Sequence, residues 1–156
     1  MFDNFLNFWN LRKALKIEGK GNTFKAEGLV KHCHNSQFKI RGKGNEVLCG
    51  EGVDLSCFSL KIEGNHNKVI IGKRFRGKRV TLLLKGSGHL IEIGDHVWLG
   101  MNVFVGKNSE IADNSVVGWG SVVTRKFKEK GIVIAGNPAV KVKENINWSR
   151  RRPTRD

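Results

Sequence analysis

Histidines, cysteines and clustered basic residues are the side chains in this chain that could do chemistry. His32 and His34 are two positions apart, so a strand would place both on one side, where imidazoles can bind a metal ion. No carboxylate or well-spaced thiol accompanies them, and the three cysteines, Cys33, Cys49 and Cys57, form no Cys-x-x-Cys pair. We therefore predict no metal site and no disulfide framework, a pattern that is typical of a reducing, cytoplasmic compartment.

A run of basic residues without any acidic residue lies between positions 73 and 85. Its members are Lys73, Arg74, Arg76, Lys78, Arg79 and Lys85. The 156 residues include 28 Lys and Arg against 14 Asp and Glu, a net charge of +14, which favours anionic partners. Two interpretations of the run stay open, a solvated face and a surface that binds anions. Nucleic acid is not expected, because helix-turn-helix and finger patterns and an aromatic stacking platform are missing.

Short strands must position these residues, because residues 91–124 repeat with a period of six. Aliphatic residues recur at Ile93, Leu99, Val105, Ile111, Val117 and Val123, and a second series lies two positions earlier, at Ile91, Val97, Val103, Ser109, Ser115 and Ser121. This period fits neither an amphipathic helix nor a plain alternating strand. Three short strands joined by sharp turns would close one triangular coil and stack the aliphatic residues inside it. An antiparallel β-sandwich is the less favoured alternative.

A longer repeat precedes the hexads. Ile40, Ile62 and Leu84 are evenly spaced, and Cys49, Ile71 and Ile93 keep the same step. A coil of three hexads is four residues shorter than the distance between these equivalent positions. We therefore interpret the longer repeat as one coil with an extension at a corner rich in Gly and Asn. Cys49 then falls in the inward column and is expected in the core. One solenoid domain is predicted over residues 16–143.

The two ends of the chain differ from the repeat. Residues 1–15 crowd together Phe2, Phe5, Leu6, Phe8, Trp9 and Leu15. We predict that they cover the open end of the stack, and the alternative is a peripheral contact with a membrane. Residues 144–156 are predicted to be a basic C-terminal tail. The sequence shows neither an apolar run of transmembrane length nor a signal peptide.

Two motifs accompany the hexad IGDHVWLG: GWGSVVT at 118–124 and AGNPA at 135–139. Together they resemble the left-handed β-helix, hexapeptide-repeat acyltransferases, most of all bacterial O-acetyltransferases that act on glycan sugars. The resemblance covers about residues 38–148. It implies an all-β, left-handed parallel β-helix that forms a homotrimer, in the cytoplasm or at the inner face of the membrane. It also implies acetyl-CoA as co-substrate, no metal, and a sugar or polysaccharide acceptor, for which the positive charge suggests an acidic glycan.

The same resemblance assigns residues to acetyl-CoA. Gly118, Gly120, Ser121 and Val123 would offer backbone groups to the pantetheine arm, and Trp119 would stack on the cofactor or on a neighbouring subunit. The adenine and phosphate end would be lined by Thr124, Arg125, Lys126, Gly136, Pro138 and Lys141, since basic groups suit the phosphates.

Acyl transfer to a sugar hydroxyl needs a general base, and histidine is suited to the task. The family's usual histidine loop before the VWxG hexad is missing here, and Arg76 stands about one coil before Trp98. His89 is the first candidate base and His96 the second, while Trp98 would lie near the acceptor or at the trimer interface. We predict direct attack without a covalent enzyme intermediate. An amino-sugar N-acetyltransferase and a catalytically silent β-helix that binds a glycan or a partner protein remain as alternatives.

Overall fold

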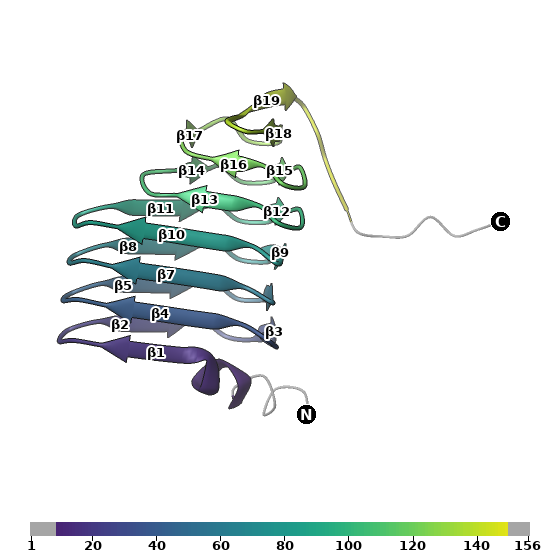
Figure 1. Cartoon of the computed structure of the whole chain (residues 1–156). Coiled ribbons are helices and arrows are strands. Elements are labelled where there is room, and N and C mark those ends of the chain that lie inside the picture. Colours follow the sequence, from purple (N-terminus) through teal and green to yellow (C-terminus); the bar gives the residue numbers. More distant parts are fainter. Residues whose placement is uncertain (1–8, 150–156) are drawn as a thin grey trace.

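The computed structural model describes residues 9–149, which form a triangular solenoid of short strands (Figure 1). Each coil contributes one strand to each of three sheets, which we call faces A, B and C in chain order. Neighbouring strands within each face are parallel, except for the last pair on face C, which is antiparallel. The prediction of an all-β, left-handed parallel β-helix is confirmed.

The strand bounds show that the coils become shorter towards the C-terminus. Face A contains β1 (Leu15–Glu18), β4 (Gln37–Arg41), β7 (Ser59–Glu63), β10 (Thr81–Lys85), β13 (Phe104–Gly106) and β16 (Val122–Val123). Face B contains β2 (Thr23–Ala26), β5 (Glu46–Cys49), β8 (Lys68–Ile71), β11 (Leu90–Ile93), β14 (Glu110–Ile111) and β17 (Lys126–Phe127). Face C contains β3 (Val30–His32), β6 (Val53–Ser56), β9 (Arg76–Lys78), β12 (Trp98–Leu99), β15 (Val116–Val117), β18 (Val133–Gly136) and β19 (Ala139–Lys143).

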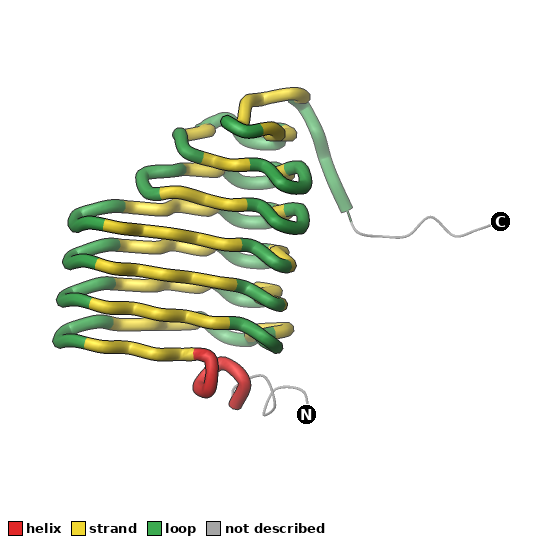
Figure 2. The backbone as a smooth tube through the Cα atoms, viewed as in Figure 1, coloured by secondary structure: helices red, strands yellow, loops and turns green. Residues whose placement is uncertain are grey.

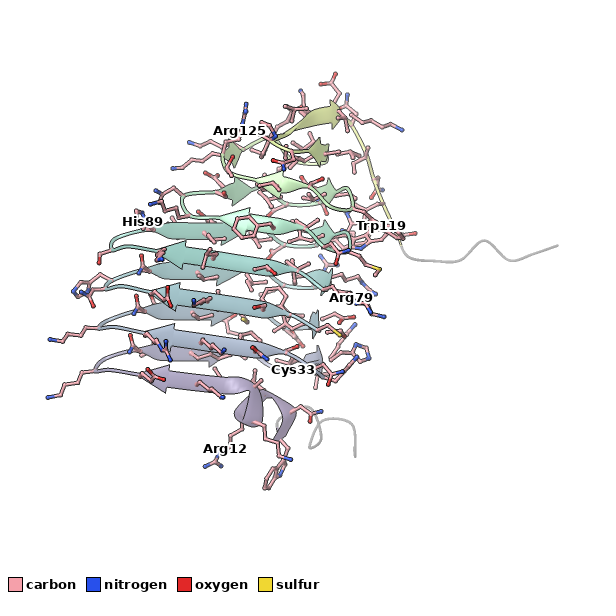
Figure 3. All side chains as sticks on the ribbon, viewed as in Figure 1. Arg12, Cys33, Arg79, His89, Trp119 and Arg125 are labelled. Carbon is pink, nitrogen blue, oxygen red and sulfur yellow. The ribbon has the colours of Figure 1, made fainter. Side chains whose placement is uncertain are left out.

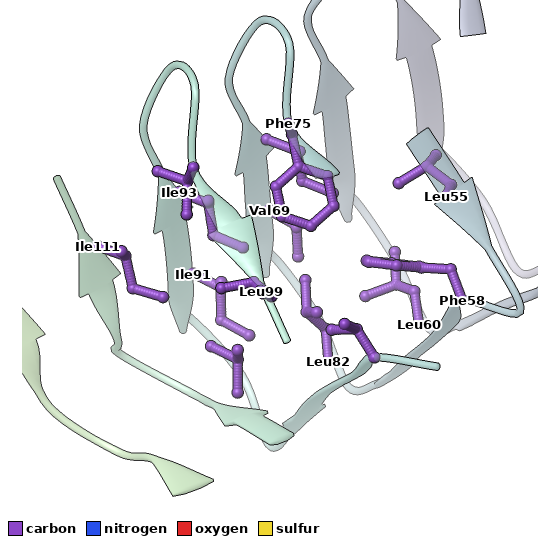
Figure 4. Packing of buried hydrophobic residues seen from close by; sticks show 14 of the residues in the cluster. Leu55, Phe58, Leu60, Val69, Phe75, Leu82, Ile91, Ile93, Leu99 and Ile111 are labelled. Carbon is purple, nitrogen blue, oxygen red and sulfur yellow. The ribbon is translucent and has the colours of Figure 1, made fainter. Parts of the chain in front are cut away.

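The hexad residues fill the interior as predicted. All six members of the aliphatic series, from Ile93 to Val123, are at most 1% exposed. Cys49 pairs in register with Ile71, and Ile71 with Ile93, so they form one inward column on face B. Figure 4 shows this packing, with Phe58 and Phe75 filling the wider coils. Burial of these side chains supplies the main stabilisation, at about 25 cal/mol for each Å² of apolar surface removed from water.

The corner between faces A and B carries the extension that the longer repeat predicts. It projects in the wide coils and is shorter after β11 (Figure 2). Buried Asn45 and Asn67 form a ladder along it, in which the Nδ2 group of Asn67 donates to Oδ1 of Asn45 at 3.1 Å and to the carbonyl of Gly86 at 2.8 Å. Oδ1 of Asn67 accepts the N–H of His89 at 3.0 Å. The ladder satisfies backbone groups that the turn would otherwise leave unpaired.

The described part of the N-terminal segment is a short helix at residues 9–14, and its Leu11 and Ala14 pack against the core. The aromatic residues of positions 1–8, predicted to belong to the same cover, lie outside the described residues, as do positions 150–156 of the predicted basic tail. Between residues 9 and 149 no helix is both long enough and apolar enough to cross a membrane.

The three cysteines should differ sharply in their reactivity towards a thiol reagent. Burial raises the pKa of Cys33 to about 11 and that of Cys49 to about 12, so both thiols stay protonated at pH 8. Cys57 is only half-buried. Mass spectrometry after a brief treatment with iodoacetamide should therefore find the label on Cys57, and on all three residues only after unfolding in urea. Early labelling of Cys49 would contradict its place in the inward column.

Candidate active site on face C

Four side chains that could take part in binding or catalysis form one column along face C. Strand pairing places His32 beside Asp54, Asp54 beside Arg76, and Arg76 beside Trp98. Neighbouring strands lie about 4.8 Å apart, so the column follows the long axis of the solenoid. Trp98 is 43% exposed, which leaves an indole face open to a ligand. The predicted stacking of Arg76 one coil before Trp98 is confirmed.

The corner between faces B and C places Arg74 and His96 next to this column. Both have a left-handed backbone, with φ of 56° for Arg74 and 53° for His96. The equivalent positions in the flanking coils are Gly52 and Asn114, the residue types that this conformation favours. Arg and His at such positions cost about 1 kcal/mol each.

The C-terminal segment runs back along this corner and covers part of the column. The N–H of Ile146 donates to the carbonyl of Gly131 at 2.8 Å, which directs residues 144–149 along the solenoid (Figure 1). Trp148 then stacks on His96, with ring centroids 4.0 Å apart and an interplanar angle of 10°. Its ring centroid is 5.8 Å from that of Trp98. One end of the segment is therefore held by a backbone contact and the other by aromatic stacking.

Two hollows open on either side of Trp148. The larger, of about 150 Å³, is lined by Arg74, Arg76, His96 and Trp148 among others. The smaller, of about 100 Å³, is lined by Asp54, Arg76, Trp98 and Trp148 among others. The indole N–H of Trp148 is buried and has no hydrogen-bond partner within residues 9–149. An unpaired buried donor costs about 1–3 kcal/mol, so an acceptor placed there would be favoured.

His96 has the ring setting that a general base needs. Its Nδ1 lies 2.9 Å from Oδ1 of Asn114, which is an acceptor. Nδ1 therefore carries the proton, and Nε2 of the neutral ring keeps its lone pair. The stacked indole of Trp148 holds the plane of the ring. His96 can thus accept a proton from a hydroxyl group bound in the hollow beside it.

His89 has a different setting. Oδ1 of Asn108 accepts the N–H of Leu90 at 3.2 Å, and this contact orients the amide so that its Nδ2 group faces Nδ1 of His89, also at 3.2 Å. Because Nδ1 accepts a hydrogen bond, the neutral ring carries its proton on Nε2. Nζ of Lys107, 3.5 Å from Nε2, is also a donor, so this longer contact is not a hydrogen bond in that tautomer. His89 lies at the corner between faces A and B, across the solenoid from face C (Figure 3). The structure therefore does not bring His89 together with Trp98 within one chain.

The residues assigned to the pantetheine arm meet at the corner between faces C and A. Oγ of Ser121 donates to the carbonyl of Gly118 at 2.7 Å and accepts the N–H of Gly136 at 3.1 Å, so this buried hydroxyl is fully engaged. Gly120 has a φ of 67°, and the space where its Cβ would stand is open. Trp119 is 74% exposed and projects from the solenoid (Figure 3). The N–H groups of Gly118 and Gly120 donate to the carbonyls of Ile134 at 2.8 Å and Met101 at 2.9 Å. The corner therefore offers an extended ligand the open space beside Gly120 and the exposed indole of Trp119.

The remaining predicted acetyl-CoA residues fall into separate groups. Thr124, Arg125 and Lys126 are exposed at the next corner, whereas Pro138 lies in the turn between β18 and β19 after a cis peptide bond. Nζ of Lys141 contacts Glu129 at 2.8 Å and Glu144 at 2.9 Å. These hydrogen bonds raise the pKa of Lys141 and occupy its ammonium group. Lys141 is therefore less suited to a phosphate than Arg125 and Lys126, whose side chains form no ion pair among the described residues.

The sequence analysis missed Trp148 and Asn114. Trp148 belongs to a segment outside the repeat, so no periodicity connects it with His96. Asn114 could have been found, because it follows His96 by one short coil of three hexads. Within residues 9–149, His, Cys, Asp and Glu side chains form no group of three or more that could hold a metal ion.

Comparison with known proteins supports the assignment of the fold. Residues 91–125 match the family model described as bacterial transferase hexapeptide (six repeats), so the predicted resemblance to hexapeptide-repeat transferases is confirmed. The solved structure of the polysialic acid O-acetyltransferase OatWY aligns with a TM-score of 0.58 and 23% identity, over 88% of this chain and 85% of that protein. The polySia-specific acetyltransferase NeuO aligns with a TM-score of 0.50 and 22% identity, over 88% and 89%. At these identities the likeness establishes a shared fold. No curated protein matches this sequence.

Proposed function

We propose that this protein transfers an acetyl group from acetyl-CoA to a hydroxyl group of a glycan sugar. The observation that supports this most directly is the setting of His96, whose ring is held by Asn114 at Nδ1, stacks on Trp148 and lines the larger hollow. Proteins with this fold include OatWY and NeuO, whose names describe transfer of acetyl groups to polysialic acid. We expect the protein to act as a homotrimer in the cytoplasm.

In the proposed mechanism His96 acts as the general base. Nε2 takes the proton of the acceptor hydroxyl as its oxygen attacks the thioester carbonyl carbon. When the C–S bond breaks, the imidazolium returns the proton to the departing thiolate. Asn114 holds Nδ1–H throughout, so the ring keeps its orientation while it gains and loses the proton.

The acetyl-CoA residues of the same chain fit this arrangement. Trp119 packs directly over Gly100, the residue that follows β12. From His96 to Gly100 the chain advances four residues, which span at most about 14 Å. An acyl group delivered past the open space beside Gly120 therefore needs to cross only the width of face C. Arg125 and Lys126 would meet the phosphates.

A calorimetric titration with acetyl-CoA tests this proposal. We expect one molecule bound per subunit, and about tenfold weaker binding when Arg125 and Lys126 are both replaced by Ala, because two charge-assisted contacts are lost. Lys128→Ala removes a positive charge from the same exposed loop and should leave the affinity unchanged. Absence of any binding to the wild-type protein would refute the proposal and favour the silent β-helix.

The charged residues beside His96 favour O-acetylation over N-acetylation. An amino sugar presents a protonated amine at neutral pH, which would be repelled by Arg74 and Arg76 beside His96. A hydroxyl acceptor carries no such penalty, and for that reason we favour O-acetylation.

A further inference from the structure

We propose that the larger hollow on face C binds a carboxylate group of an acidic sugar, so that the acceptor glycan of the proposed acetyl transfer is polyanionic. This inference rests on the proposed function for the identity of the ligand as an acceptor. The binding itself can be measured without acetyl-CoA.

Two arginines without counter-ions carry the first part of the argument. Arg74 and Arg76 both line the hollow, and within residues 9–149 neither pairs with a carboxylate. Asp54 is next to Arg76 in the column, but its Oδ2 lies 3.2 Å from Nδ1 of His32 and its Oδ1 accepts from Oγ of Ser56 at 2.8 Å. The positive charge in the larger hollow is therefore left for a ligand, and guanidinium groups suit carboxylates because they can bind both oxygens.

The second part of the argument concerns Trp148, in the C-terminal segment that covers part of the column. Trp148 lines both hollows, and its indole N–H is buried without a hydrogen-bond partner within residues 9–149, so a ligand oxygen that reached this group would complete its hydrogen bonding. Trp98, on the far side of Trp148 in the column, offers an apolar surface against which a sugar ring can pack. The site thus combines two guanidinium groups, an indole N–H and an exposed aromatic face. This combination suits a carboxylate-bearing sugar of a glycan chain better than an isolated inorganic anion.

The orientation of the site suggests a polymer. The column from His32 to Trp98 runs along the solenoid, so successive sugars could extend from the hollow across consecutive coils. His96 lies at the wall of the same hollow, which places the proposed base beside a bound residue of the chain.

The backbone of Arg74 permits an unusually clean test. Arg74→Gly removes the charge and suits the φ of 56°, so the fold should be retained. Arg79→Gly is the matched control, because Arg79 has a φ of 55° at the next corner along the chain and does not line either hollow. Trp148→Phe removes the N–H group but keeps an aromatic ring over His96.

The probes are a short oligogalacturonate, its methyl ester as the uncharged counterpart, and adenosine 3′,5′-bisphosphate, each titrated by calorimetry at low salt. We expect the oligogalacturonate to bind the wild-type protein and Arg79→Gly equally, Arg74→Gly about tenfold more weakly, and Trp148→Phe several-fold more weakly. The methyl ester should not bind. Equal losses in Arg74→Gly and Arg79→Gly would overturn the proposal by showing only a general charge effect. Displacement of the oligogalacturonate by the bisphosphate would overturn it by assigning the arginines to acetyl-CoA.

Discussion

Replacement of His96 by Asn should lower the rate of acetyl transfer by about 10²–10⁴-fold, the usual contribution of a general base. Asn favours the left-handed backbone at this position, where φ is 53°, so the free energy of unfolding should stay the same or rise slightly. Transfer of labelled acetyl groups to an acidic glycan, with a urea titration of the same sample, measures both effects.

Two other histidines serve as controls for this experiment. His66→Asn makes the same substitution at a φ of 54° on the corner between faces A and B, far from the site, and should leave the rate unchanged. His89→Asn introduces the residue type that Asn45 and Asn67 have at the equivalent position of the preceding coils, and it should also leave the rate unchanged. If His89→Asn abolishes transfer while His96→Asn does not, the base is His89, and the site would then need residues from two subunits.

A substitution in the asparagine ladder should lower the free energy of unfolding more than other substitutions in the turns of the wide coils. Asn67→Ala removes the acceptor of the His89 N–H and the donor to the Gly86 carbonyl, at a position that is 1% exposed. Both groups lie in partly buried contacts that water reaches incompletely, so the loss should lower the free energy of unfolding by about 2 kcal/mol. The shift of the urea midpoint measures this loss.

Asn65 provides the matched control for the ladder. It lies in the same turn but is exposed, and its Oδ1 accepts the N–H of Lys43 at 2.9 Å. Water can replace that contact, so Asn65→Ala should cost less than about 1 kcal/mol. Similar losses in both variants would mean that the turn, rather than the buried ladder, determines the stability of the corner.

Most of the fold could be predicted because the repeat is a direct consequence of packing. A residue such as Ile93 recurs in register only if each coil returns to the same inward point, so the spacing fixes both the coil and its core. The change from the longer repeat to plain hexads likewise located the extended corner after Leu84. The role of Asn67 in pairing buried backbone groups was less apparent, since a Gly- and Asn-rich turn also suits an exposed loop.

The candidate site was harder to predict, because it depends on contacts that no repeat encodes. Trp148 stacks on His96 although the two are far apart in the sequence, through a segment that follows the last strand. The ring setting of His96 depends on Asn114, which counting coils could have placed beside it, whereas that of His89 depends on Asn108, which could not be assigned without the corner in place. Counting coils would have shown that Gly52, Arg74, His96 and Asn114 share one turn position.

The reversal of β19 has a consequence for the assembly of whole molecules. A stack of parallel coils has no intrinsic end, and its last strands could accept the first strands of another copy and grow into a fibre. On face C the outermost strand is β19, which runs antiparallel to β18 and bears Lys141 and Lys143. An incoming β3 would therefore meet a strand of the wrong direction and the positive charge of Lys143. The same hairpin that completes the solenoid thus also terminates polymerisation at that end.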